Sequence, residues 1–168
     1  MTDALAHTSP DGRTHPLREH LLAVAHGAET FGARWGAGHW AGLAGLWHDL
    51  GKYRPGFQDY IRSDPDAHIE GKLPSGSEKT HSAAGALHAL KSFESGFGAA
   101  GAKAARILAY VIAGHHAGLA DWNAPAHRLF DRIAARKKVD VPRGFGDYEV
   151  TIAESDLPTG VELQRRVG

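Results

Sequence analysis

The sequence of 168 residues contains no cysteine. Disulfide bonds and thiolate metal sites are therefore excluded, and the cytoplasm is the expected location. No apolar run approaches the roughly 18 residues that a membrane-spanning helix needs. The N-terminus also lacks the charged start and apolar middle of a signal peptide. We expect an intracellular protein that does not contact a membrane.

A net charge of one sign is also missing, because 19 lysines and arginines balance 19 aspartates and glutamates. No overall electrostatic field attracts nucleic acid, so any such attraction has to come from a local patch or from another polypeptide. One basic cluster could contact phosphate, although most such clusters are solvated faces. Its members are Arg132, Arg136, Lys137, Lys138 and Arg143.

The length and a hydrophobic content of 42% suffice for one domain over residues 1–168. Apolar residues at helical spacing, with proline, serine and glycine at the boundaries, predict several helices. The most continuously apolar of these helices, 103–114, is expected to be central. Residues 1–15 form a lead-in strand or loop, and 64–79 and 96–101 are connectors. The expected helices are 17–31, 39–50, a short one from Pro55, one capped by Thr80 or Ser82, 103–114, and one from Pro125.

An imidazole stands beside a carboxylate at His48-Asp49, inside the otherwise apolar run 43–52. A buried carboxylate needs hydrogen bonds, a cation or a metal, and imidazole is the commonest nitrogen ligand for a metal. Lys52, one helical turn after His48, carries its charge on the same side. The alternative is an ordinary helix end, with Asp49 and Lys52 solvated and His48 packed in the core.

Other histidines of the twelve in the chain also lie near predicted helix ends. His20 is at the edge of a buried stripe, and His81 is in the first turn of a helix. His115 and His116, bracketed by glycines after an apolar helix, can converge on one point. For His20 the alternative is a boundary residue that packs on the core, and for His81 it is a solvated residue at the helix cap. For the pair His115-His116 the alternative is two solvated side chains. The positions less suited to ligation are His26 and His88.

This arrangement resembles the HD superfamily of metal-dependent phosphohydrolases. More narrowly, it is similar to the HD nuclease domain of the CRISPR-associated type I helicase-nuclease, CRISPR-associated protein three, or its stand-alone HD nuclease subunit. The residues that carry the resemblance are Pro16-Leu17-Arg18-Glu19-His20-Leu21, Trp47-His48-Asp49-Leu50-Gly51-Lys52, Lys79-Thr80-His81-Ser82-Ala83 and Ile112-Ala113-Gly114-His115-His116-Ala117-Gly118-Leu119.

The resemblance implies an all-α HD bundle with a metal site at helix ends. His20, His48 and Asp49 would hold one divalent metal, and His81, His115 and His116 a second, with Asp49 bridging. So many imidazoles favour manganese, iron, cobalt or nickel over magnesium. The implied activity is metal-dependent cleavage of single-stranded DNA in CRISPR antiviral defence, with an effector complex and a fused or separate helicase as partners.

Two further roles are expected around the metals. Asp49 and Lys52 are the expected catalytic residues, and Lys52 would also hold a substrate phosphate or the developing charge. Ser82 would donate a hydrogen bond to the substrate nearby.

The chain departs from the family pattern at the first metal. The pattern closes that site with an aspartate on a later helix, and none of the later aspartates lies in the expected apolar helical context. We therefore expect a domain that is incomplete at its C-terminus. The aspartates concerned are Asp131, Asp140, Asp147 and Asp156.

Three other functions are compatible with the same motifs. The first is an HD phosphohydrolase that acts on nucleotides or cyclic dinucleotides. The second is a non-catalytic HD module that docks on a CRISPR complex or an inhibitor. The third is a helical bundle that stores or senses metal, which would leave Asp49 and Lys52 without a task.

Overall fold

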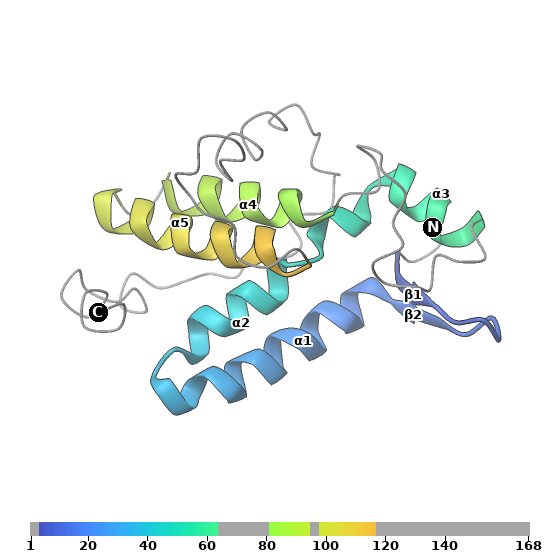
Figure 1. The fold of residues 1–168 in the computed structure, drawn as a ribbon, viewed down its shortest axis with the longest axis horizontal. Coiled ribbons are helices and arrows are strands. Elements are labelled where there is room, and N and C mark those ends of the chain that lie inside the picture. Colours follow the sequence, from blue (N-terminus) through green and yellow to red (C-terminus); the bar gives the residue numbers. More distant parts are fainter. Residues whose placement is uncertain (1–3, 64–80, 95–97, 117–168) are drawn as a thin grey trace.

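The computed structural model describes residues 4–63, 81–94 and 98–116 (Figure 1). The described chain begins with an antiparallel hairpin and continues as helices. Asp11 and Gly12 lie in the turn between the two strands, and Gly12 adopts a φ of 81°, which favours glycine. The elements are β1 (Leu5–Thr8), β2 (Thr14–Pro16), α1 (Leu17–Gly32), η1 (Ala33–Trp35), α2 (Gly38–Trp47), η2 (Leu50–Tyr53), α3 (Pro55–Ser63), α4 (Ser82–Glu94) and α5 (Gly98–Gly114).

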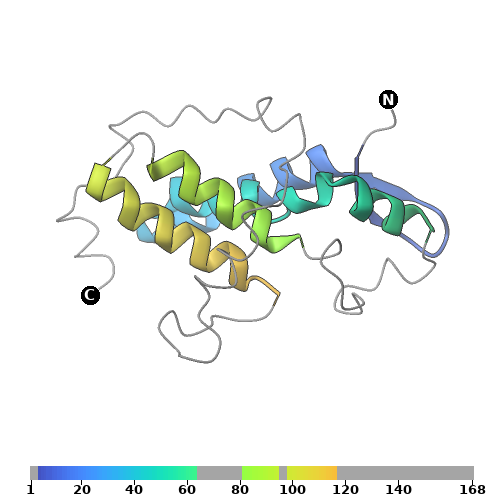
Figure 2. The ribbon, with the colours of Figure 1, turned by 90° about the horizontal axis from the view of Figure 1, so that it is seen from above.

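The four longer helices form two antiparallel pairs. Helix α1 packs along α2, and α4 packs along α5, as Figures 1 and 2 both show. Helix α2 also contacts α4 and α5, so it joins the two pairs. Because α1 and α4 begin where α2 and α5 end, four helix termini meet at one end of the bundle.

The core lies between the helix pairs. Leu17 and Leu21 of α1 and Phe93 of α4 are at most 1% exposed. The ring of Trp47 meets that of Phe93 edge-on, with centroids 6.1 Å apart. Burial of each large apolar side chain contributes about 1.5–3 kcal/mol, so this contact helps to hold α4 against the end of α2 that precedes His48.

Two glycines allow α4 to approach the turn after α2. A Cβ atom at Gly51 would overlap the carbonyl oxygen of His81, and one at Gly85 would overlap the carbonyl oxygen of Trp47. Neither overlap is with a flexible side chain, so no rotamer change would relieve it. These glycines set the distance between His81 and the turn that contains Asp49.

The structure corrects two details of the prediction for α5. The helix begins at Gly98, so the predicted connector 96–101 is wrong over its last residues. Ile107 and Val111 are 39% and 44% exposed, so α5 is not buried on all sides among the described residues. The small residues Ala105 and Ala109 are instead fully buried in the core, and helices with such residues can approach closely.

The other predicted boundaries are close to those observed. The predicted helix 39–50 ends at Trp47, followed by a break at His48-Asp49 and the short helix η2. Phe31, predicted in the apolar stripe of α1, is 62% exposed and packs against Trp35. The predicted connector 64–79, the helix from Pro125 and the basic cluster lie outside the described residues. None of the described helices is long and apolar enough to cross a membrane.

Candidate metal centre

Asp49 lies in the break between α2 and η2, and its side chain is 3% exposed. Its Oδ2 atom faces the two histidines that come from α1 and from the end of α2. The Nε2 atoms of His20 and His48 each lie 3.2 Å from Oδ2. These two Nε2 atoms are 3.3 Å apart. One carboxylate oxygen and two imidazole nitrogens therefore surround a common point.

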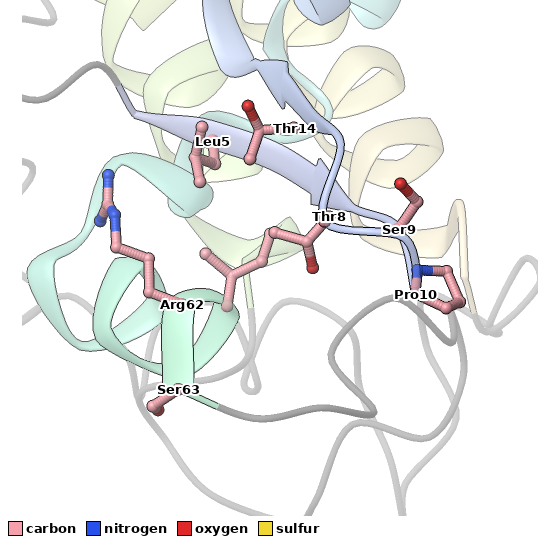
Figure 3. Close-up of a pocket in the computed structure, with 9 residues that line it drawn as sticks. Leu5, Thr8, Ser9, Pro10, Thr14, Arg62 and Ser63 are labelled. Atoms are coloured by element: carbon pink, nitrogen blue, oxygen red, sulfur yellow. The ribbon is translucent and has the colours of Figure 1, made fainter.

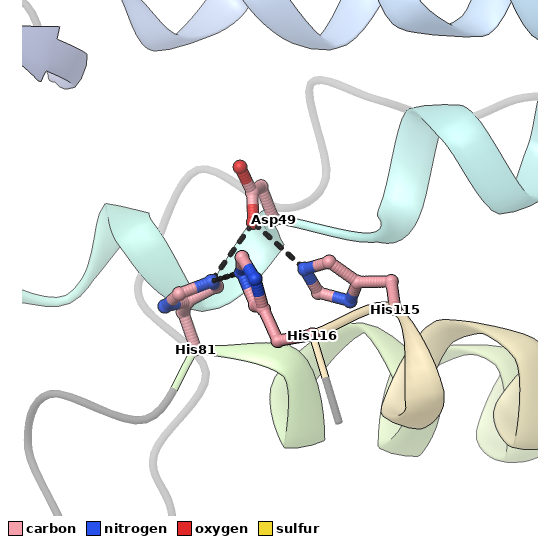
Figure 4. Close-up of side chains that lie close together, drawn as sticks. All are labelled: Asp49, His81, His115 and His116. Atoms are coloured by element: carbon pink, nitrogen blue, oxygen red, sulfur yellow. Dashed lines mark hydrogen bonds and ion pairs between the residues drawn. The ribbon is translucent and has the colours of Figure 1, made fainter. Parts of the chain in front are cut away.

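The Oδ1 atom of the same carboxylate faces a second group of imidazoles (Figure 4). The Nε2 atom of His81 is 3.1 Å away, and that of His115 is 3.4 Å away. The Nε2 atom of His116 lies 2.8 Å from that of His81. Within the described part of the chain, no group donates a hydrogen bond of acceptable geometry to the buried Oδ1 atom. A cation would satisfy this oxygen.

Each imidazole comes from a helix end. His20 lies in the first turn of α1, His48 directly follows α2, and His81 directly precedes α4. His115 and His116 follow the last residue of α5. The structure thus brings together the six residues that the sequence suggested as ligands, from four segments that are separated along the chain.

Backbone contacts set the orientation of two of these rings. The Nδ1 atom of His48 lies 2.6 Å from the carbonyl oxygen of Gly45, and that of His115 lies 2.6 Å from the carbonyl oxygen of Ile112. A carbonyl only accepts, so Nδ1 carries the proton in each ring and Nε2 keeps its lone pair. This second hydrogen bond is typical of imidazoles that ligate a metal.

The donor set therefore fits divalent cations. Two groups of side chains have ligand atoms within 4.8 Å of one another, and Asp49 belongs to both. The groups differ in size among the described residues, because one offers three ligands and the other four. Imidazole and carboxylate suit the later first-row metals. The groups are His20, His48 and Asp49, and Asp49, His81, His115 and His116.

The electrostatics keep the carboxylate ionised. Burial alone would raise the pKa of Asp49, but the close approach of four imidazoles to the carboxylate, led by that of His115, holds this pKa well below its ordinary range. Burial likewise opposes protonation of His48, yet the adjacent Asp49 raises the pKa of His48 above its ordinary value of 6.5. A metal bound at Nε2 must displace this proton, so acid weakens binding.

Lys52 is buried within the same centre. Its Nζ atom lies 2.8 Å from Oδ2 of Asp49 and donates to the carbonyl oxygen of Ala6 at 3.3 Å. The ammonium group therefore faces the carboxylate and the hairpin. The expected contact of Lys52 with substrate remains a prediction. Ser82 is the first residue of α4, next to His81 and partly buried, and its predicted role also remains open.

Two histidines of the hairpin were not among the residues predicted from the sequence. The ring of His7 meets that of His20 edge-on at 4.7 Å, and the ring of His15 lies 5.6 Å from that of His20. His7 and His15 are directly opposed across the strands. Each of them lies four residues from Asp11 in the turn, and this equal spacing could have indicated the pairing.

A pocket of about 410 Å³ lies on the other side of the hairpin, against α3 (Figure 3). Hydroxyl groups and one arginine supply its polar lining, and Ile61 and Leu5 its apolar lining. None of its lining residues belongs to the two groups around Asp49. Its polar residues include Thr8, Ser9, Thr14, Arg62 and Ser63.

An all-α bundle with histidines and a shared aspartate at its helix ends defines a class of metal-binding proteins. Residues 17–137 match the family model of the HD domain, which covers more than half of the chain. The chain therefore belongs to the HD domain family. The predicted all-α HD fold is confirmed. HD domains are in general metal-dependent phosphohydrolases that bind divalent metals. No curated protein matches the chain significantly.

The matched range extends past the described residues. The aspartates that were considered for the first metal lie outside the described ranges: Asp131, Asp140, Asp147 and Asp156.

Proposed function

We propose that this HD domain is a nuclease that hydrolyses phosphodiester bonds of single-stranded DNA in CRISPR antiviral defence. The observation that carries the proposal is the division of Asp49 between two groups of imidazoles, with Oδ2 facing His20 and His48 and Oδ1 facing His81 and His115. A carboxylate in this position can hold two cations side by side. Bridged pairs of cations are characteristic of phosphodiester hydrolysis.

Two divalent ions in such a site would lower the pKa of a water molecule and neutralise charge on the phosphate. The protein's part is to fix their ligands in advance. Asp49 remains ionised despite its burial, and Lys52 holds its Oδ2 atom. The backbone carbonyls behind His48 and His115 direct both Nε2 atoms inward. Little reorganisation is then needed when substrate arrives.

The sequence motifs support the nuclease branch of the family. His81-Ser82 begins α4, and His115-His116 follows α5 within Gly-His-His-Ala-Gly. Five imidazoles to one carboxylate favour manganese, iron, cobalt or nickel over magnesium, which prefers oxygen ligands. We propose these metals for the site.

The balanced charge of the chain supports a partner that delivers the DNA strand. With 19 basic and 19 acidic residues, the isolated chain has no net field for DNA. We propose that a CRISPR effector complex and a fused or separate helicase bring the strand to the centre, and that this takes place in the cytoplasm. Cleavage by the isolated chain should then be strongest at low salt.

The test is digestion of circular single-stranded DNA with Mn²⁺ at low salt. Wild type should nick and degrade the circle, and the double variant H48A/D49A should not. The variant H26Q, which changes an exposed histidine of α1, serves as the control and should match wild type. Equal cleavage by wild type and H48A/D49A would refute the proposal.

Two further outcomes would favour other functions. Hydrolysis of nucleotides or cyclic dinucleotides without cleavage of the circle would favour a phosphohydrolase of small substrates. Calorimetry without any heat of Mn²⁺ or Ni²⁺ binding would favour a non-catalytic docking module.

A further inference from the structure

The hairpin adds two imidazoles, those of His7 and His15, beside the His20 ring of the buried centre. The His20 ring lies between those of His48, at 5.3 Å, and His7, at 4.7 Å. His15, which is exposed, lies 5.6 Å from His20 and 6.1 Å from His7, so the rings of His7, His15 and His20 form a triangle. Because His15 is exposed while His7 and His20 are partly buried, a strand that reaches the centre past the hairpin can contact His15 as well as His20.

The hairpin is held rigidly in this position. A bulge between Leu5 and His7 shifts the register of β1, and bulges reorient side chains near active sites. The carbonyl oxygen of the extra residue, Ala6, accepts a hydrogen bond from Lys52. Buried Gln58 of α3 bonds both the N–H and the carbonyl of Leu5, at 2.8 and 2.9 Å. The two histidines therefore stand on a fixed platform.

We propose that His7 and His15 form a phosphate subsite, which binds the backbone of a nucleic-acid strand next to the bond that is cleaved. This inference rests on the proposed function and adds residues that lie outside both ligand groups. An imidazole offers an N–H donor in its neutral form as well as when charged, and a phosphodiester accepts such bonds on two oxygens. The acidic residue of the hairpin turn, Asp11, is paired with Arg13 at 2.7 Å, which reduces its repulsion of a phosphate.

The subsite predicts a difference between long and short substrates. A labelled single-stranded oligonucleotide reaches the hairpin, whereas bis(p-nitrophenyl) phosphate covers the metal centre alone. In the double variant H7A/H15A, KM for the oligonucleotide should rise about 10-fold, with kcat within about twofold of wild type. Both constants for the small diester should be unchanged. The variant H7Q/H15Q keeps N–H donors and should retain most of the oligonucleotide affinity.

Equal losses on both substrates, or loss of bound Mn²⁺ in H7A/H15A, would overturn the subsite and assign both histidines to the metal centre. Equal losses in the alanine and glutamine variants would show a structural role and also overturn it. Fluorescence anisotropy of the labelled oligonucleotide, measured without metal, separates this proposal from the nuclease. Binding by wild type that weakens in H7A/H15A supports the subsite even if wild type cleaves nothing. Cleavage by wild type with unchanged binding in the variant refutes the subsite alone.

Discussion

The ammonium group of Lys52 and the carboxylate of Asp49 form an ion pair of 2.8 Å in which both side chains are at most 4% exposed. A buried carboxylate without a cation is costly. Lys52 provides that cation from within the chain, so the protein can fold before a metal binds. A divalent cation would then join a carboxylate that is already oriented.

Replacement of Lys52 by methionine should therefore destabilise the metal-free protein. We expect the free energy of unfolding to fall by about 3–5 kcal/mol, since the variant leaves a buried charge without its partner. Mn²⁺ should then raise the melting temperature more in K52M than in wild type, because the metal restores a cation beside Asp49. Thermal unfolding with EDTA and with Mn²⁺ measures both effects.

The matched control is K103M, which changes an exposed lysine of α5 and should alter stability by less than about 0.5 kcal/mol. If K52M keeps wild-type stability but loses cleavage, Lys52 contacts substrate, as the sequence first suggested.

Because Asp49 belongs to both ligand groups, substitutions in the two groups should affect metal binding differently. Titration calorimetry with Mn²⁺ or Ni²⁺ should show that H20A and H81A each weaken a different binding event, because these residues belong to different groups. D49N should weaken both events, since each group contains Asp49. Undiminished metal binding by D49N would remove the basis of the centre.

Substitution of Gly51 by alanine, with Gly27 as the control position, tests the close approach of α4 to the turn after α2. G51A places a methyl group against the carbonyl of His81 and should destabilise the fold by about 1–3 kcal/mol. It should also weaken Ni²⁺ binding, because His81 is displaced from Asp49. Chemical denaturation and calorimetry measure the two effects.

G27A is the matched control. Gly27 lies in α1, where an added Cβ atom meets nothing within 4 Å, so alanine should stabilise the helix by up to about 1 kcal/mol. A loss of stability in G27A comparable to that in G51A would contradict the packing argument.

The lowered pKa of His88 predicts that the stability of the fold depends on pH. Burial, together with the charge of Lys91, lowers the pKa of His88 below 6.5 in the folded protein. Its contribution to stability is therefore present above pH 6.5 and is lost as pH falls from 6.5 through the lowered pKa, because the unfolded chain binds the proton first. H88Q should thus gain stability relative to wild type as pH falls over this range.

Melting temperatures of both proteins at pH values from 7.5 to about 5 test this expectation. H39Q is the control, because His39 is exposed and its side chain is 75% accessible. A constant difference between H88Q and wild type across this range would show that His88 does not titrate as described.

The sequence predicted the ligand candidates better than it predicted their geometry. His48-Asp49 and His115-His116 were recognisable because each motif is local and lies at the end of an apolar helix. The resemblance implied a bridging Asp49, but the residues alone did not predict that its two oxygens face separate groups of imidazoles. That division depends on how closely α4 approaches the turn after α2, which Gly51 permits through contacts between distant segments.

Two misjudged features have physical reasons. His7 escaped notice because a bulged hairpin of four- and three-residue strands leaves no clear alternation in the sequence. The apolar residues of 103–114 suggested a central helix, yet among the described residues Ile107 and Val111 are exposed, while the small Ala105 and Ala109 are buried. Composition gives the hydrophobicity of a helix, but it does not predict which face of the helix packs against its neighbours.

The contacts behind His48 and His115 tie the ligands to the integrity of two helices. Each ring donates to a carbonyl three residues earlier, in the last turn of the preceding helix. Fraying of the last turn of α2 or α5 would release a ring together with its carbonyl. Metal binding should consequently slow amide hydrogen exchange in these two turns, because order at the helix ends and the position of the two rings are gained or lost together.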